Sequence, residues 1–151
     1  MNVENEAALV TGASRGLGKE VARELARRGA RVVLVARGAE ELETAVEEIA
    51  RSSGARDRVH GLAFDVGDKE AAHRIAGAAA ALVGPPSIVV HNASTLGPLP
   101  MPLLLDTECE DLDRVLATNL VGPFRLTKAL AGPMVLARRG LFLFLSSDAA
   151  V

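Results

Sequence analysis

Tyrosine and tryptophan are both absent from the 151 residues of this chain. Cysteine occurs once, at Cys109, which excludes an internal disulfide and a cysteine-based metal cluster. The longest apolar runs fall well short of the ~18 residues that suggest a membrane-spanning helix. The net charge of −2 provides no basic surface for a nucleic-acid backbone. We therefore expect neither a membrane protein nor a nucleic-acid-binding protein.

The N-terminus, MNVENEAALV, lacks the basic stretch and the following apolar stretch of a secretory signal, so we expect a cytoplasmic protein. Hydrophobic residues make up 49% of the chain and charged residues 24%, which is typical of a globular domain. The length suits a single domain over residues 1–151. The three histidines, His60, His73 and His91, lack the spacing of metal ligands, so no metal site is expected.

Apolar, β-branched stretches alternate along the chain with segments of helical period. The strand candidates are Ala7–Val10, Arg31–Ala36, Val59–Phe64, Ser87–His91 and Leu141–Leu145. The helix candidates are 16–29, 39–52, 68–82 and 111–138, the last with candidate kinks at Gly122-Pro123 and Gly132-Pro133. Strands that are apolar on both faces and separated by helices indicate a parallel sheet covered on both sides. The pattern predicts an α/β, Rossmann-like, doubly wound sheet with strand order 3-2-1-4-5.

A glycine-rich loop, Thr11-Gly12-Ala13-Ser14-Arg15-Gly16-Leu17-Gly18, lies directly between the first strand and the first helix. Glycine lets a diphosphate approach the backbone, and the helix N-terminus behind the loop offers free N–H groups. An ordinary strand-to-helix turn is the alternative interpretation. The position after the first strand of an alternating β/α chain favours a dinucleotide site.

The spacing G-x-x-x-G-x-G, with its leading threonine, resembles the cofactor-binding signature of the short-chain dehydrogenase/reductase family. The resemblance extends over residues 7–151, with motifs in the family's order. It implies an oxidoreductase that transfers a hydride between a nicotinamide cofactor and a small alcohol or carbonyl substrate. Family members are commonly dimers or tetramers, so the resemblance also implies a possible homo-oligomer.

Two further segments match the family at the ends of later strands. Asp65-Val66 stands where members place an aspartate that binds the adenine amino group, although this carboxylate could instead cap the next helix. His91-Asn92-Ala93-Ser94 resembles the NNAG element that lines the cofactor, with His91 and Ser94 as departures. The resemblance therefore implies cofactor contacts for Asn92, Ala93 and Ser94, whereas we interpret His91 as a core histidine.

Two residues are implied to take part in catalysis. Asn119, in LATNLVGPF, stands where the family carries an active-site asparagine whose side chain and distorted backbone hold a water of the proton relay. Ser147, the second serine of Leu145-Ser146-Ser147, corresponds to the serine that bonds the substrate carbonyl. A solvent-facing helix residue and a helix-capping turn are the respective alternatives.

The cofactor preference is predicted from charge. NAD-preferring relatives end strand two with an acidic residue that binds the ribose 2′-hydroxyl. Here Arg37 follows that strand, and Arg15 adds a cation within the glycine loop. Two guanidiniums suit a 2′-phosphate, so we expect NADP(H), with NAD(H) second. Both arginines being solvated surface charges is the alternative.

The family's catalytic tyrosine and lysine are missing from the chain. In relatives the tyrosine follows the serine and acts as general acid or base, with its pKa lowered by the lysine. The corresponding positions fall beyond Val151, and the chain has no other tyrosine. Leu141–Leu145 would also form an apolar edge strand, which proteins usually cover. We expect the domain to be incomplete at its C-terminus, before its last helix and strands.

Three functional hypotheses remain open. The chain is a short-chain oxidoreductase represented by its N-terminal part, a non-catalytic NADP(H)-binding module, or a fragment without a function of its own. A serine hydrolase is excluded because Ser146 and Ser147 lack the G-x-S-x-G elbow. The proline-rich segment 96–105 is predicted to be a loop at the carboxyl end of strand four, bordering a substrate pocket.

Overall fold

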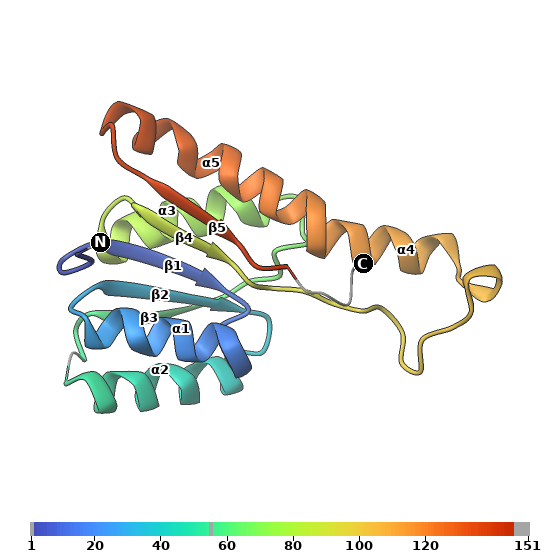
Figure 1. Cartoon of the computed structure of the whole chain (residues 1–151), viewed down its shortest axis with the longest axis horizontal. Coiled ribbons are helices and arrows are strands. Elements are labelled where there is room, and N and C mark those ends of the chain that lie inside the picture. The colour runs from blue at the N-terminus through green and yellow to red at the C-terminus, as the bar shows by residue number, and fades with distance from the viewer. Residues whose placement is uncertain (1, 55, 147–151) are drawn as a thin grey trace.

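A parallel five-stranded sheet forms the centre of the computed structural model, which describes residues 2–54 and 56–146 (Figure 1). The strands are β1 (Ala7–Thr11), β2 (Arg31–Ala36), β3 (Val59–Ala63), β4 (Ile88–His91) and β5 (Leu141–Phe144). The helices are α1 (Gly16–Arg27), α2 (Ala39–Ser53), α3 (Ala71–Val83), α4 (Cys109–Leu116) and α5 (Gly122–Leu136). All pairings are parallel in the order β3-β2-β1-β4-β5, which confirms the predicted doubly wound fold.

Side chains of the central strands are buried on both faces of the sheet. In β1, Ala8 and Val10 pack toward α1 and α2, whereas Ala7 and Leu9 pack toward α3 and α5. Figure 1 shows α1 and α2 on one face and α3 and α5 on the other. Strands apolar on both faces require this arrangement, because each face must exclude water. The observed strands agree with the predicted ones to within one residue at each end.

Helix α3 begins at Ala71, three residues later than predicted. Two aspartates hold the preceding residues in turns. Asp65 Oδ1 accepts a hydrogen bond from the Gly67 N–H at 2.8 Å, and Asp68 Oδ1 accepts one from the Glu70 N–H at 3.0 Å. Short carboxylate side chains compete with helical hydrogen bonding in this way, so the helix starts only after them.

The helix predicted over 111–138 is divided in the structure into α4 and α5, which are joined without a gap by a π-helical turn, η2 (Ala117–Val121), directly before the predicted kink at Gly122-Pro123. The Gly122 N–H donates to the Ala117 carbonyl, five residues back. A Cβ at Gly122 would lie 2.3 Å from the Val66 carbonyl oxygen, so only glycine permits this approach to the segment after β3. Helix α5 continues through Pro133 to Leu136, so the second Gly-Pro pair does not end it.

The segment between β4 and α4 carries one short 3-10 turn, η1 (Leu104–Asp106), and extends past the carboxyl ends of the strands (Figure 1). In the same view, helix α4 lies end to end with α5 and extends past the edge of the sheet. Among the residues placed by the structure, no helix has the length and hydropathy needed to cross a bilayer.

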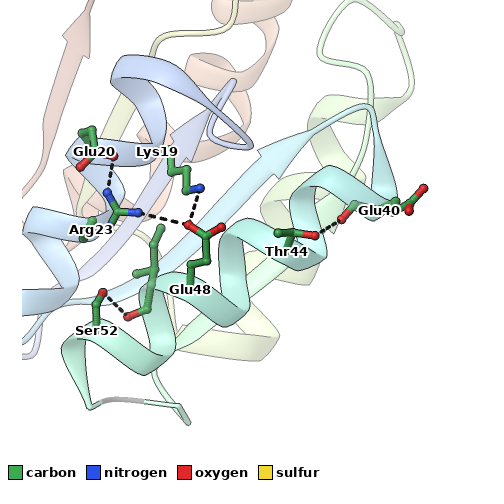
Figure 2. A network of polar contacts seen from close by, with 8 residues as sticks. Lys19, Glu20, Arg23, Glu40, Thr44, Glu48 and Ser52 are labelled. Atoms are coloured by element: carbon green, nitrogen blue, oxygen red, sulfur yellow. Dashed lines mark hydrogen bonds and ion pairs between the residues drawn. The ribbon is translucent and has the colours of Figure 1, made fainter.

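Two groups of polar contacts connect the elements: one joins helices α1 and α2, and the other lies at the amino end of the sheet. On the outer helical layer, Lys19 of α1 pairs with Glu48 of α2 at 2.6 Å, and Arg23 lies 3.6 Å from the same carboxylate (Figure 2). The hydrogen bond from Lys19 lowers the pKa of Glu48. At the amino end of the sheet, the buried Glu6 carboxylate accepts a hydrogen bond from Ser87 Oγ at 2.5 Å and pairs with Arg139. This carboxylate thus connects β1 to the segments preceding β4 and β5.

Candidate functional site

A cavity of about 400 Å³ lies at the carboxyl ends of β1, β2, β3 and β4. Open α/β sheets bind ligands on this side, where the strand order reverses between β1 and β4. Its lining comes from the end of β2, the segments that follow β1 to β4, the first turn of α2 and η2: Gly12, Ser14, Arg15, Val35, Ala36, Arg37, Gly38, Glu41, Phe64, Asp65, Val66, Asn92, Ala93, Ser94 and Thr118. The structure therefore brings together the glycine loop, Arg37, Asp65-Val66 and Asn92–Ser94, all predicted site segments.

Thr11 and Asn92 join the glycine loop to the end of β4. Thr11 Oγ1 accepts hydrogen bonds from the backbone N–H groups of Asn92 and Ala93, each at 3.1 Å. Asn92 Nδ2 donates to the carbonyls of Thr11 at 3.1 Å and Gly12 at 3.0 Å. Because both side chains bond to the backbone of the other segment, they hold the glycine loop and the end of β4 in direct contact beside the cavity.

The three glycines of the loop differ in what surrounds them. A Cβ at Gly12, where φ is +65°, would lie 2.8 Å from the Ala93 Cα. A Cβ at Gly18 would lie 2.4 Å from Asn92 Nδ2. Gly16, where φ is +58°, has nothing within 4 Å of its Cβ position. Gly12 and Gly18 are therefore required by contacts within the protein, whereas Gly16 leaves open space beside the backbone at the start of α1.

Charged groups of both signs border the cavity at its β2–β3 end. Arg37 Nη1 lies 3.9 Å from Asp65 Oδ2, and both side chains are substantially exposed. The other Asp65 oxygen binds the Gly67 N–H, so this carboxylate caps a turn and not helix α3, whose N-cap is Glu70. Arg15 lines the same cavity from the glycine loop. A partly solvated guanidinium of this kind is free to reorient toward an anionic ligand.

Asn119 lies in the π-helical turn and contacts the loop after β4. Its Oδ1 accepts a hydrogen bond from the Thr95 N–H at 2.9 Å, and its Nδ2 donates to the Thr95 carbonyl at 2.8 Å. The side chain is exposed, yet both ends of its amide are used. Asn119 thus holds the loop beside the cavity, and its predicted part in a proton relay stays a prediction.

His91 is 5% exposed at the end of β4. Its Nε2 shares a hydrogen bond of 3.0 Å with Thr127 Oγ1 of α5, and its ring stacks on Phe144 at 4.5 Å between centroids. Burial lowers the pKa of His91 to about 4, so the imidazole is neutral near pH 7. Among the described groups, its Nδ1 has no hydrogen-bond partner. This geometry supports the interpretation of His91 as a core residue.

Sequence reasoning missed several lining residues, of which Glu41 and Thr118 carry polar side chains. Glu41 belongs to the first turn of α2, and Thr118 to η2. A signal existed for Glu41, because the first turn of the helix after β2 must lie beside Arg37. For Thr118 the signal was weaker: the resemblance implies a distorted backbone at the neighbouring Asn119, but nothing in the sequence placed Thr118 itself in the cavity. Ser147, the predicted carbonyl-binding serine, lies outside the described residues.

A family model described as short chain dehydrogenase matches residues 6–151. The bovine protein "Dehydrogenase/reductase SDR family member 7B" is 37% identical over 151 residues, covering 96% of this chain and 45% of that protein. The chain spans about half the length of the curated relatives it matches.

Solved structures show the same fold. A metagenomic short-chain oxidoreductase in complex with NADP is 35% identical, with a TM-score of 0.87, covering 97% of this chain and 64% of that one. L-Sorbose reductase from Gluconobacter frateurii, complexed with NADPH and L-sorbose, is 27% identical with a TM-score of 0.89. That match covers 100% of this chain and 56% of the reductase.

Proposed function

The chain belongs to the short-chain dehydrogenase family, and we propose that it forms the cofactor-binding part of an NADP(H)-dependent oxidoreductase acting on a small alcohol or carbonyl compound. The single observation that carries this proposal is the cavity at the switch point of the sheet, bordered by the glycine loop and two arginines. NADPH and L-sorbose in one relative, and NADP in another, are consistent with it. We further propose that residues 1–151 act as one cofactor-binding domain.

The residues present fit a dinucleotide at one particular place. The open space beside Gly16 lies at the N-terminus of α1, where unpaired backbone N–H groups favour a diphosphate. Arg15 and Arg37 would bind the 2′-phosphate through charge-assisted hydrogen bonds. Asp65 and Val66 would border the adenine, and the end of β4 from Asn92 to Ser94 would line the nicotinamide half.

The bound cofactor would supply a hydride from its nicotinamide C4 to a carbonyl carbon, and one proton would complete the alcohol. This chain's residues prepare the place for that exchange. Thr11 and Asn92 hold the glycine loop and the end of β4 together, and Asn119 holds the Thr95 segment through both ends of its amide. We propose Asn119 as a positioning residue and Ser147 as the group that polarises the substrate carbonyl.

A second candidate function follows from one observation in the sequence: the chain contains no tyrosine. The 151 residues therefore hold no phenol that could give or take the proton. If no other part of the protein supplies this group, the same site would serve a non-catalytic NADP(H)-binding module. Intact mass of the isolated protein, compared with the 15.7 kDa of this sequence, separates the two when combined with an assay of carbonyl-dependent NADPH oxidation.

The cofactor proposal is tested by calorimetric titration of the isolated protein with NADPH and NADH. We expect Arg37→Ala to weaken NADPH binding by roughly 10-fold or more, the usual effect of losing a hydrogen bond to a charged group, and to leave NADH binding nearly unchanged. Arg51→Ala is the matched control, because Arg51 lies in the last turn of the same helix that Arg37 precedes. Equal losses for both dinucleotides, or none, would contradict a 2′-phosphate contact.

A further inference from the structure

Two adjacent glutamates, Glu40 and Glu41, occupy the first turn of α2. Of these two described residues, Glu41 alone borders the cavity. Glu40 and Glu41 both follow Gly38, the N-cap residue. Glu41 lines the cavity together with Arg15 and Arg37, whereas Glu40 is absent from its lining. Figure 2 shows Glu40 in the first turn of α2, with its side chain directed away from the Lys19–Glu48 contact. Position, and not residue type, distinguishes the two carboxylates.

The Glu41 carboxylate lies over the turn between β2 and α2. A Cβ built at Gly38 would be 3.8 Å from Glu41 Oε2, which places this oxygen beside the backbone that follows Arg37. A carboxylate in a first helical turn stabilises the helix through the dipole. That effect applies to Glu40 equally, so it does not account for the presence of Glu41 in the cavity wall.

The positive and negative charges of the residues that line the cavity are equal in number. Arg15 and Arg37 contribute two positive charges, and Glu41 and Asp65 contribute two negative charges. Asp65 already lies 3.9 Å from Arg37 and binds the Gly67 N–H. Glu41 is thus the remaining carboxylate, and its removal would leave the wall with a net charge of +1. Since a phosphate monoester carries about −1.5 to −2 charges at pH 7, the wall would then favour it more strongly.

We propose that Glu41 is a specificity-determining residue that limits the preference for NADP(H) and keeps NAD(H) acceptable. This inference rests on the proposed function, because it assigns the β2–α2 end of the cavity to the adenosine ribose. The carboxylate opposes a 2′-phosphate through like charge and offers an acceptor to a 2′-hydroxyl. Arg37 and Arg15 attract a 2′-phosphate and so favour NADP(H). The ratio of NADPH affinity to NADH affinity is therefore set by the two arginines together with the two carboxylates, Glu41 and Asp65.

The test compares dissociation constants of NADPH and NADH for the isolated protein and three variants. We expect Glu41→Gln to raise the ratio of NADPH affinity to NADH affinity about three- to tenfold, and Glu41→Lys to raise it further. Glu40→Gln is the matched control, since it removes a carboxylate from the same helical turn outside the cavity, and we expect an unchanged ratio. The gain should shrink between low salt and about 0.5 M salt, because exposed charges are screened.

The outcomes separate this inference from the proposed function. An NADPH preference that depends on Arg37 but stays within twofold for both Glu41 variants would overturn the role of Glu41 and leave the proposed function intact. Equal gains for Glu40→Gln and Glu41→Gln would overturn it too, because the effect would then be a general one of charge on α2. Failure of the unmodified protein to bind either dinucleotide would reject the proposed function itself.

Discussion

The chain up to residue 95 and the chain from residue 96 to residue 146 bury their apolar side chains to very different extents. In the first region, Leu17 and Leu82 are the large apolar residues that stand exposed among those described. In the second, leucines from Leu96 to Leu105 and a row on α4 and α5 are exposed, with Leu105 reaching 96%. The first region supplies most of the core, and the second completes one face of the sheet with Leu126, Leu130 and Met134 of α5 while leaving many of its other apolar side chains exposed.

The cavity belongs almost entirely to the first region. Its lining comes from the ends of β1 to β4 and the turn into α2, with Thr118 as the contribution of the second region. Beside Thr118, the second region is attached near the site by the Asn119 amide on Thr95 and by Gly122 against the Val66 carbonyl. A rigid binding surface thus depends on a well-packed core, with a less buried segment attached at defined points.

The largest effect should come from truncating equivalent side chains in the two regions. Leu34 is fully buried in β2, so Leu34→Ala should lower the free energy of unfolding by about 2–5 kcal/mol, combining lost transfer energy with a cavity. Leu105→Ala should change it by less than about 0.5 kcal/mol. Urea denaturation measures both. A similar cost at the two positions would mean that Leu105 is covered in the protein in solution.

The joint between the regions is tested by glycine substitutions within α5. Gly122→Ala should lower the free energy of unfolding by about 1–3 kcal/mol and weaken NADPH binding, because the new Cβ collides with the Val66 carbonyl. Gly132→Ala is the control in the same helix. Its Cβ position is open, so it should stabilise the protein by up to about 1 kcal/mol. The joint is not required if the two variants behave alike in thermal denaturation.

His91 makes the packing between β4, β5 and α5 sensitive to acid. Its pKa is about 4 in the folded protein and 6.5 in the unfolded chain, so the unfolded state binds more protons between these values. Stability should therefore rise with pH across this window and be lost as pH falls from 6.5 toward 4, by at most about 3 kcal/mol. Denaturation at pH 7.5 and 4.5 measures the loss.

The control separates His91 from other acid-sensitive groups. Hydrogen bonds from Arg28 and Lys19 lower the pKa of Glu24 and Glu48, and these carboxylates also lose stabilisation in acid. His91→Asn should reduce the pH dependence relative to the unmodified protein, whereas His73→Asn, an exposed change on α3, should leave it unaltered. An identical pH dependence in His91→Asn would show that the imidazole does not cause the effect.

Much of the fold could be predicted, because the strands are short apolar runs with few alternatives. Arg31–Ala36 was predicted with its observed bounds, and the glycine loop has its expected place. The helical segment over 111–138 and its irregularity at Gly122-Pro123 were predicted, but the π-helical form was not, since Gly122 packs there against Val66, a residue far away in sequence. Such a long-range contact leaves no mark on the local helical pattern.

The candidate site was predictable where a motif fixed the residue and not where packing selected it. Asp65 was predicted to lie beside the cofactor, yet its turn with Gly67 depends on the backbone after β3. Glu41 carried no motif and enters the cavity only because α2 begins immediately after Arg37. Asn119 was selected by resemblance, but its two hydrogen bonds to Thr95 follow from a loop whose path the sequence left open.

Hydrogen exchange with and without NADPH tests the central claim most directly, because it reports on both regions in one experiment. Binding in the cavity should slow amide exchange in the glycine loop, in the turn from Arg37 to Glu41, and at Asn92–Ser94, and leave the segment 99–106 unchanged. Protection confined to the segment 99–106, or no protection at saturating NADPH, would contradict a dinucleotide site at the carboxyl ends of the strands.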